Sequence, residues 1–143
     1  MRVAVLNGVN LDVLHRRDPA LYGGISLNQL EGQIYSWARE LELLADCRQT
    51  NSEAEYVGWC HDAYGWASGV VVNPGAWTHY SYAIRDALEL FAAPVVEVHL
   101  SNVDEREEWR RHSVIADIAA RRIVGKGPEG YHEALTFLAE GPK

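Results

Sequence analysis

The chain has 143 residues, of which 48% are apolar and 23% charged, and its net charge is −7. This length suits one domain with a hydrophobic core, and the composition is ordinary for a soluble globular protein. The negative charge argues against a nucleic-acid surface, although local arginines can still hold a small anion. No apolar run approaches the roughly 18 residues of a membrane span, and residues 3–6 are too few for a signal peptide, so we expect a cytoplasmic protein without membrane contact.

The N-terminal part of the chain predicts a strand, a long loop and a helix. Residues 3–6 form a short apolar run that is typical of a buried strand. The polar loop that follows, residues 8–25, is unusually long, which indicates a lid or a binding loop. Ser26 and Gln29 then form a capping box, and apolar residues recur behind it at helical spacing, so we expect a helix there.

The middle of the chain predicts two more strands, each followed by a helix. Residues 43–48 indicate a strand, and Ser52 with Glu55 repeats the capping box before the next helix. The β-branched run at residues 70–72 is typical of a strand buried on both faces, and the sequence NPG ends it. A helical pattern begins at about His79. Its buried face is predicted to contain Ala83, Ala87 and Leu90.

The C-terminal part continues the same alternation. Residues 95–100 predict a fourth strand, residues 104–112 a charged helical turn, and residues 123–124 a weaker fifth strand. The sequence GP at residues 127–128 then starts a last helix. Strands that alternate with helices predict a single α/β domain over residues 1–143 with a parallel sheet. The two cysteines, Cys47 and Cys60, are too few for a disulfide scaffold or a zinc site, and we expect buried thiols.

Polar residues follow three of the predicted strands, where the carboxyl ends of parallel strands form a binding crevice. Those that follow the first strand are Asn7, Asn10, Arg16, Arg17 and Tyr22. The third strand supplies Asn73 and His79, and the fourth supplies Glu97, His99, Ser101, Arg106, Arg110 and Arg111. We therefore expect a polar site at this edge of the sheet.

Two pairs within this set indicate acid–base chemistry. Glu97 and His99 are two residues apart on a strand and share a face, and a buried carboxylate that stabilises an imidazolium suits a general acid. Tyr22 lies six residues after Arg16 and five after Arg17, and a nearby guanidinium favours the phenolate, which is a base for a carbon-bound proton. Simpler interpretations stay open: a structural ion pair, an exposed loop tyrosine beside solvated arginines, and, for His79, a helix cap.

Other chemistries lack their sequence signals. There is no G-x-G-x-x-G after a strand, no P-loop and no G-x-S-x-G, which argues against dinucleotide, nucleotide and serine-hydrolase sites. The histidines and carboxylates show no tight ligand spacing such as H-E-x-x-H, so we expect no metal. The only lysines, Lys126 and Lys143, lie far from the main strand ends, which disfavours a Schiff base. Cofactor-free acid–base chemistry on a small anion remains.

Several motifs, in order along nearly the whole chain, resemble the type II 3-dehydroquinate dehydratases: LNGVNLDVLHRRDPALYGG, RQTNSEAE, NPGAWTHYSYAIRDAL, VVEVHLSN, REEWRRHS and GKGPEGYHEAL. The resemblance implies a flavodoxin-like, doubly wound, five-stranded parallel sheet and a dodecamer built of trimers. It also implies dehydration of 3-dehydroquinate to 3-dehydroshikimate through an enolate, without metal or other cofactor. Roles in aromatic biosynthesis and in quinate breakdown both stay open.

The resemblance also assigns roles to single residues. Tyr22 matches the base, Arg17 the arginine that keeps it ionised, His99 the acid, Glu97 its orienting partner, and Asn10 the holder of a water at the enolate oxygen. The groups that grip the ring hydroxyls match Asn73, His79 and Arg110. The positions that receive the substrate carboxylate match Leu100 and Ser101, and Asp86 matches an aspartate that reaches a neighbouring subunit's site.

The chain departs from the family pattern at Val9, Asp12, His15, Asp18, Ala54, Trp77 and Asp104. Asp12 and Asp18 could compete for the guanidinium that Tyr22 needs, and the bulky Trp77 could narrow the pocket. Asp104, which replaces a frequent histidine, falls in a charged run that we expect to be solvated surface. Two alternatives therefore stay open: a family member that acts on a different cyclic hydroxy acid, and a flavodoxin-like binding module without turnover.

Overall fold

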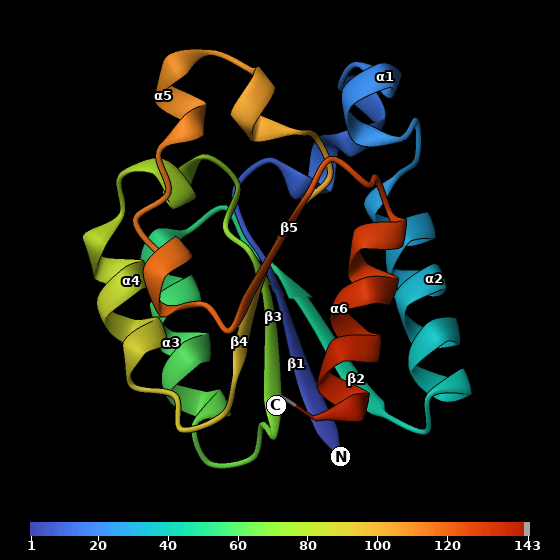
Figure 1. The fold of residues 1–143 in the computed structure, drawn as a ribbon, viewed down its shortest axis with the longest axis vertical. Coiled ribbons are helices and arrows are strands. Elements are labelled where there is room, and N and C mark those ends of the chain that lie inside the picture. Colours follow the sequence, from blue (N-terminus) through green and yellow to red (C-terminus); the bar gives the residue numbers. More distant parts are fainter. Residues whose placement is uncertain (142–143) are drawn as a thin grey trace.

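A five-stranded parallel sheet forms the centre of the protein in the computed structural model, which describes residues 1–141 (Figure 1). Its strands are β1 (Arg2–Asn7), β2 (Leu44–Gln49), β3 (Gly69–Asn73), β4 (Val95–His99) and β5 (Arg121–Val124). They lie in the order β2–β1–β3–β4–β5, and every neighbouring pair is parallel. The predicted α/β class and parallel sheet are therefore confirmed, and the strand order is that of a flavodoxin-like doubly wound fold.

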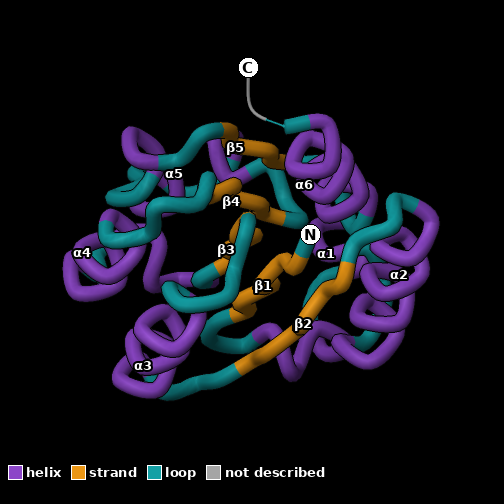
Figure 2. Tube along the Cα trace, turned by 90° about the horizontal axis from the view of Figure 1, so that it is seen from below, coloured by secondary structure: helices purple, strands orange, loops and turns teal. Residues whose placement is uncertain are grey.

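Helices cover both faces of this sheet. They are α1 (Pro19–Tyr22), α2 (Leu27–Glu40), α3 (Glu53–Ala63), α4 (Tyr82–Glu89), α5 (Glu108–Arg111) and α6 (Glu129–Glu140). Helices α2 and α6 pack on one face, and α3 and α4 pack on the other (Figure 2). The central strand β3 is apolar on both sides because successive side chains enter opposite layers: Val71 faces α2 and α6, whereas Val70 and Val72 face α3 and α4. None of the helices within residues 1–141 has the length and apolar character that a bilayer crossing requires.

Short 3₁₀ segments connect these elements: η1 (Leu11–Arg16), η2 (Gly75–His79), η3 (Val103–Glu105) and η4 (Ala116–Ile118). The segments after β1 and β3 touch at the carboxyl edge of the sheet, where the Gly8 amide donates to the Asn73 carbonyl at 2.8 Å. Gly75 has a φ of +66°, and a Cβ at this position would lie 2.6 Å from the Val9 carbonyl oxygen. Glycine is therefore required where the two loops meet.

Helix α4 corrects two expectations about the central stretch. Residues 75–79 are 3₁₀, and the α-helix begins only at Tyr82, where the Ser81 hydroxyl accepts from the Ile84 amide at 3.1 Å. The predicted buried face was wrong, because Ala83 and Leu90 are exposed and only Ala87 is buried. With this start, Ile84 and Leu88 stand one turn apart and face the sheet, so the larger side chains define the buried face.

Three further expectations are only partly confirmed. Ser26 and Gln29 form the complete capping box, but the Ser52 amide donates to the Thr50 hydroxyl at 3.0 Å and not to Glu55. The charged turn at residues 104–112 is split into η3 and α5, with extended backbone at Arg106 between them. Both cysteines are free thiols, but only Cys60 is fully buried, whereas Cys47 is partly exposed. Burial raises the pKa of each thiol to about 12.

Candidate active site

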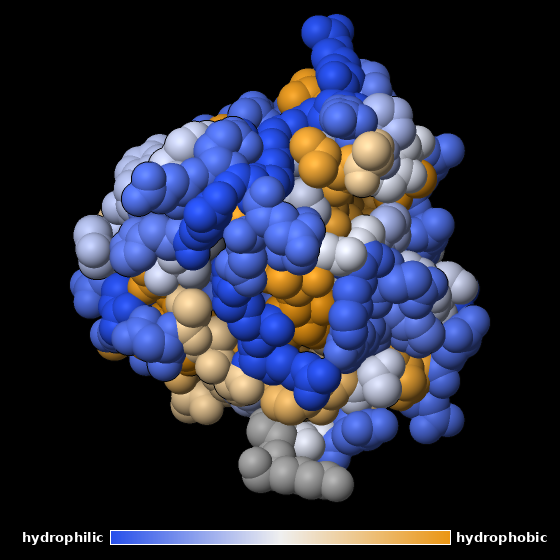
Figure 3. Space-filling model, turned by 45° about the horizontal axis from the view of Figure 1, so that its top comes forward, coloured by the Kyte–Doolittle hydropathy of each residue, from blue (hydrophilic) through white to orange (hydrophobic). Residues whose placement is uncertain are grey.

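A cavity of about 180 Å³ lies at the carboxyl edge of the sheet, among the segments that follow β1, β3 and β4. Figure 3 turns this end of the molecule forward and shows hydrophilic side chains around a smaller apolar area. The polar residues that line the cavity are Asn10, Arg17, Tyr22, Asn73, His79, His99, Ser101, Arg106 and Arg110. The topology thus brings the predicted strand ends to one site. Tyr22 and His99 line the same cavity.

One side of the cavity presents a phenol to two guanidinium groups. The Tyr22 hydroxyl accepts from Arg17 Nη2 at 2.5 Å and also from Arg106 Nη1. The guanidinium carbon of Arg17 lies 4.0 Å from the centre of the tyrosine ring. Burial lowers the pKa of Arg17, while the charge of Tyr22 acts in the opposite direction. Two positively charged side chains therefore donate to one phenol oxygen.

The sequence placed Arg106 among the polar residues at this edge of the sheet, but it assigned no role in the chemistry to this arginine. Its Nη1 also donates to the Ser101 hydroxyl at 3.2 Å, so it joins the end of β4 to Tyr22. The expected competition from the two lid carboxylates was wrong. Asp18 caps α1 by accepting from the Ala20 amide, and Asp12 accepts from Asn51. Trp77 does not narrow the cavity, because it is buried in the core against Tyr56.

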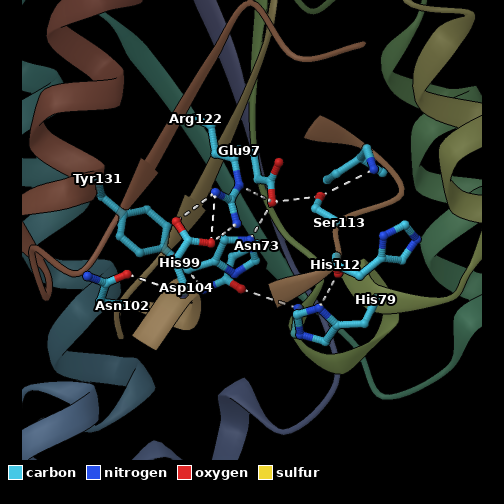
Figure 4. Close-up of polar contacts among 12 residues, drawn as sticks. Asn73, His79, Glu97, His99, Asn102, Asp104, His112, Ser113, Arg122 and Tyr131 are labelled. Atoms are coloured by element: carbon cyan, nitrogen blue, oxygen red, sulfur yellow. Dashed lines mark hydrogen bonds and ion pairs between the residues drawn. The ribbon is translucent and has the colours of Figure 1, made fainter. Parts of the chain in front are cut away.

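The cavity is also lined by an imidazole that is backed by a buried carboxylate (Figure 4). Nε2 of His99 lies 2.6 Å from Oε2 of Glu97, whose side chain is fully buried. The same oxygen accepts from the Ser113 hydroxyl at 3.0 Å and from Nε of Arg122 at 3.3 Å. Burial alone would raise the pKa of Glu97, but the bonds and charges of His99, Arg122 and Ser113 outweigh it and lower that pKa. Glu97 is therefore a charged carboxylate at neutral pH.

His79 lies beside this pair, with its ring centre 6.4 Å from that of His99. Nδ1 of His79 donates to the backbone carbonyl of His112 at 2.7 Å, because a carbonyl oxygen can only accept. Burial lowers the pKa of His79, and nearby His99 and Arg110 lower it further, although His112 and Glu97 act in the opposite direction. His79 is therefore a neutral imidazole at pH 7. It is not the helix cap, since Ser81 caps α4.

The floor of the cavity rests on a buried polar network that joins three elements. The side-chain amide of Asn73 donates to the Tyr131 hydroxyl at 3.0 Å, and that hydroxyl donates to Asn7 Oδ1 at 2.7 Å. The Asn73 side-chain oxygen accepts from the Gly75 amide at 3.2 Å. Tyr131 lies in α6, and the sequence assigned it no role in the site. Its hydroxyl in fact fixes Asn73, which lines the cavity.

Asn10 stands in left-handed backbone conformation, with a φ of 69°, and is held from outside the cavity. Its amide donates to Asn51 Oδ1 at 2.9 Å, and Gln49 Nε2 donates to the same oxygen at 3.2 Å. Nδ2 of Asn51 in turn donates to Asp12 at 3.0 Å. Gln49 and Asn51 therefore support the loop that carries Asn10.

The remaining predicted residues are divided between the cavity and the surface. Leu100, Ser101 and Arg110 line the cavity, and Arg110 also donates to Glu107 at 3.0 Å. Asp86 does not line it, because it lies on the exposed side of α4. Across residues 1–141, the histidine, cysteine, aspartate and glutamate side chains form no cluster of three or more that could hold a metal ion.

Comparison with known proteins agrees with this geometry. Residues 1–139 match the family model described as dehydroquinase class II. A 3-dehydroquinate dehydratase of Halalkalibacterium halodurans is 48% identical, over 99% of this chain and 97% of the relative, and one of Deinococcus radiodurans is 49% identical, over 95% and 96%. The crystal structure of type II dehydroquinase from Propionibacterium acnes superposes with a TM-score of 0.94 at 45% identity, over 97% of this chain and 96% of the other.

Proposed function

This chain belongs to the class II dehydroquinases, whose reaction is the dehydration of 3-dehydroquinate to 3-dehydroshikimate, and we propose that the cavity at the sheet edge is its active site. One observation carries this proposal. The Tyr22 phenol with its two arginine donors and the His99 imidazole with its buried carboxylate line one cavity. A base and an acid that share a cavity can remove a proton and a hydroxyl from the same ring.

The first step falls to Tyr22. Its phenolate, stabilised by Arg17 and Arg106, takes the proton next to the ketone, and the electrons of the broken C–H bond form the enolate. Asn10 holds a water against the enolate oxygen, which spreads the developing charge over fixed donors. The side-chain bonds of Asn51 keep the backbone of Asn10 in place for this role.

The second step falls to His99. Because Nε2 is bonded to Glu97, Nδ1 is the nitrogen that gives its proton to the departing hydroxyl. The enolate collapses, the carbon–oxygen bond breaks, water leaves and a double bond conjugated with the ketone forms. The Glu97 carboxylate keeps the imidazole ring in orientation and stabilises its protonated form before the transfer.

Substrate binding uses the remaining lining residues. The carboxylate is received by the backbone amides of Leu100 and Ser101 and by the Ser101 hydroxyl. Asn73, His79 and Arg110 grip the ring hydroxyls. Since Nδ1 of His79 donates to a carbonyl and this imidazole is neutral, its Nε2 is an acceptor for a hydroxyl proton. Residues 8–25 act as the lid, because η1 and α1 carry Arg17 and Tyr22 over the cavity.

The proposal includes an oligomeric state. Twelve copies form a dodecamer of trimers in the cytoplasm, and Asp86 reaches the active site of a neighbouring subunit. The exposed side of α4 supports this assembly. Tyr82, Asp86 and Leu90 are four residues apart along it, and the two apolar members are each 66% exposed, which suits a surface that a second copy covers.

Turnover of 3-dehydroquinate tests the proposed function directly. Purified protein is mixed with this substrate, and the absorbance of the conjugated enone product is followed. We expect steady product formation without added metal. Binding without turnover would indicate a non-catalytic binding module instead. Neither binding nor turnover would indicate a different cyclic hydroxy acid as the substrate.

A further inference from the structure

Glu97 has a third partner that the acid–base mechanism does not use. Register places Arg122 of β5 directly beside Glu97 of β4, so the two side chains lie together on one face of the sheet. Nε of Arg122 lies 3.3 Å from Oε2 of Glu97, the same oxygen that His99 contacts. The carboxylate that backs the proposed acid therefore shares its charge between an imidazole and a guanidinium.

Arg122 is itself held by a second carboxylate. Its Nη1 lies 3.2 Å from Oδ2 of Asp104, and both Nη atoms lie 3.3 Å from Oδ1. Asp104 stands at a fixed place, because its amide donates to Asn102 Oδ1 at 3.2 Å at the start of η3. Figure 4 shows the Arg122 side chain extending from β5 to both carboxylates. Asp104 is exposed, as expected for this charged run, and it is also an ion-pair partner of Arg122.

We propose that Arg122 is a positioning residue of the dehydration, which acts through Glu97 on the proton affinity of His99, and that Asp104 sets how strongly it acts. The proposal rests on the proposed role of His99 as the acid. It adds to that role an alternating chain of charges, namely Asp104, Arg122, Glu97 and His99, that runs from the protein surface to the cavity.

Electrostatics gives the two outer members opposite effects on His99. The positive charge of Arg122 offsets part of the negative charge of Glu97, so Glu97 stabilises a protonated His99 less strongly. Asp104 offsets the charge of Arg122 and restores part of the stabilisation. The other groups that face this pair are uncharged Ser113 on Glu97, and neutral His79 and positive Arg110 near His99. Those groups are unchanged when Arg122 or Asp104 is replaced.

The dependence of kcat/KM on pH tests this inference, because its alkaline limb reports loss of the proton from the acid in the free enzyme. In Arg122→Met, Glu97 acts on His99 without a competitor, and we expect this limb to move to higher pH by roughly half a unit or more. In Asp104→Asn, Arg122 acts more strongly on Glu97, and we expect the limb to move to lower pH. A purely structural defect would lower the rates at every pH without opposite movements.

Three controls keep the result decisive. Arg121→Met removes the neighbouring arginine of the same strand, which pairs with Glu133 on the surface, and should leave the limb in place. Arg122→Lys keeps a positive charge and should return the limb toward that of the unmodified enzyme. Titration of the His99 ring by NMR, in enzyme without substrate, should follow the same order of variants. If Arg122→Met does not fold, Asp104→Asn and Arg122→Lys decide.

The experiments distinguish a failure of the proposed function from a failure of the charge coupling between Arg122 and His99. If the unmodified enzyme does not turn over 3-dehydroquinate but the NMR titration of His99 shifts in both variants, the proposed function fails and the charge coupling survives. If the enzyme turns over and both variants keep the limb and the titration of the unmodified protein, the coupling through Glu97 is wrong.

Discussion

Tyr22 differs from an ordinary surface tyrosine in the two guanidinium groups that its oxygen faces. Spacing indicated Arg16 and Arg17 alike, because they precede Tyr22 by six and five positions in the same loop, and the family resemblance then selected Arg17. No spacing indicated Arg106, which lies 84 positions away in sequence from Tyr22. Among the arginines after β4, the feature that singles out Arg106 is the extended backbone between η3 and α5, and sequence patterns do not predict such a break.

Removal of either arginine should therefore weaken the base. We expect Arg17→Ala and Arg106→Ala each to lower kcat by about 10²-fold or more, because a hydrogen bond from a charged donor to the anion is lost. Arg16→Ala is the matched control, since this neighbouring arginine is exposed and makes no contact with Tyr22 among the contacts of residues 1–141. Equal activity of Arg106→Ala and Arg16→Ala in steady-state assays would show that the second guanidinium is not needed.

At the scale of elements, the last helix is joined to the sheet by a polar contact as well as by apolar packing. Tyr131 of α6 reaches Asn73 of β3 and Asn7 of β1 through one hydroxyl. Helical periodicity can place a residue such as Tyr131, which is fully buried, on the inner face of this helix. It could not predict the hydrogen bonds, because they depend on which strand ends lie beneath the ring.

The substitution Tyr131→Phe tests this polar contact between α6 and the sheet. The change leaves the buried amides of Asn7 and Asn73 without their shared partner, and we expect a loss of about 1–3 kcal/mol in the free energy of unfolding. Urea denaturation at a fixed protein concentration measures it. A change below about 0.5 kcal/mol, the usual range for surface substitutions, would mean that the network does not hold α6 to the sheet.

Element boundaries show where sequence patterns are weakest. The central strands β1, β3 and β4 were predicted well because parallel strands buried on both faces appear as short apolar runs. The start of α4 was placed too early, since the 3₁₀ turn of η2 has a helix-like pattern and Ser81 is not followed by a glutamate or glutamine at the third position. The wrong start then shifted the predicted buried face to Ala83 and Leu90, both of which are exposed.

At the scale of the whole molecule, folding stability should depend on the ionisation of the site. The pKa of His79 in the folded protein is lowered, mainly by burial. The unfolded chain, with an ordinary histidine pKa of about 6.5, binds this proton more readily. The contribution of His79 is therefore fully present above about pH 6.5 and is lost as the pH falls through the lowered pKa. Glu97, whose pKa is also lowered, extends the loss to more acidic pH.

The dependence of stability on pH provides the test. Between about pH 6.5 and 5, we expect the free energy of unfolding to fall with pH less steeply in His79→Gln than in the unmodified protein. His15→Gln is the control, because this histidine is exposed in η1 and should leave the slope unchanged. Urea denaturation across this range measures both slopes. Parallel curves for all three proteins would contradict the effect assigned to burial of His79.

Assembly is the property that a single chain leaves to experiment. We expect light scattering to give a mass twelve times the 16.0 kDa of one chain. We also expect Tyr82→Asp to yield smaller species. Tyr82 is exposed in the single chain, and the substitution would place a charge in the apolar surface that a second copy is proposed to cover. A monomer with full activity would contradict both the assembly and the role of Asp86.

The most direct test of the central claim is the turnover of Tyr22→Phe with 3-dehydroquinate, measured together with substrate binding by calorimetry. In the proposed mechanism, the Tyr22 phenolate, held by two arginines, removes the substrate proton in the cavity that His99 also lines. We therefore expect the kcat of Tyr22→Phe to fall by about 10²- to 10⁴-fold, while its Kd for the substrate stays within roughly tenfold of that of the unmodified enzyme. A Tyr22→Phe enzyme with a near-normal kcat would contradict it.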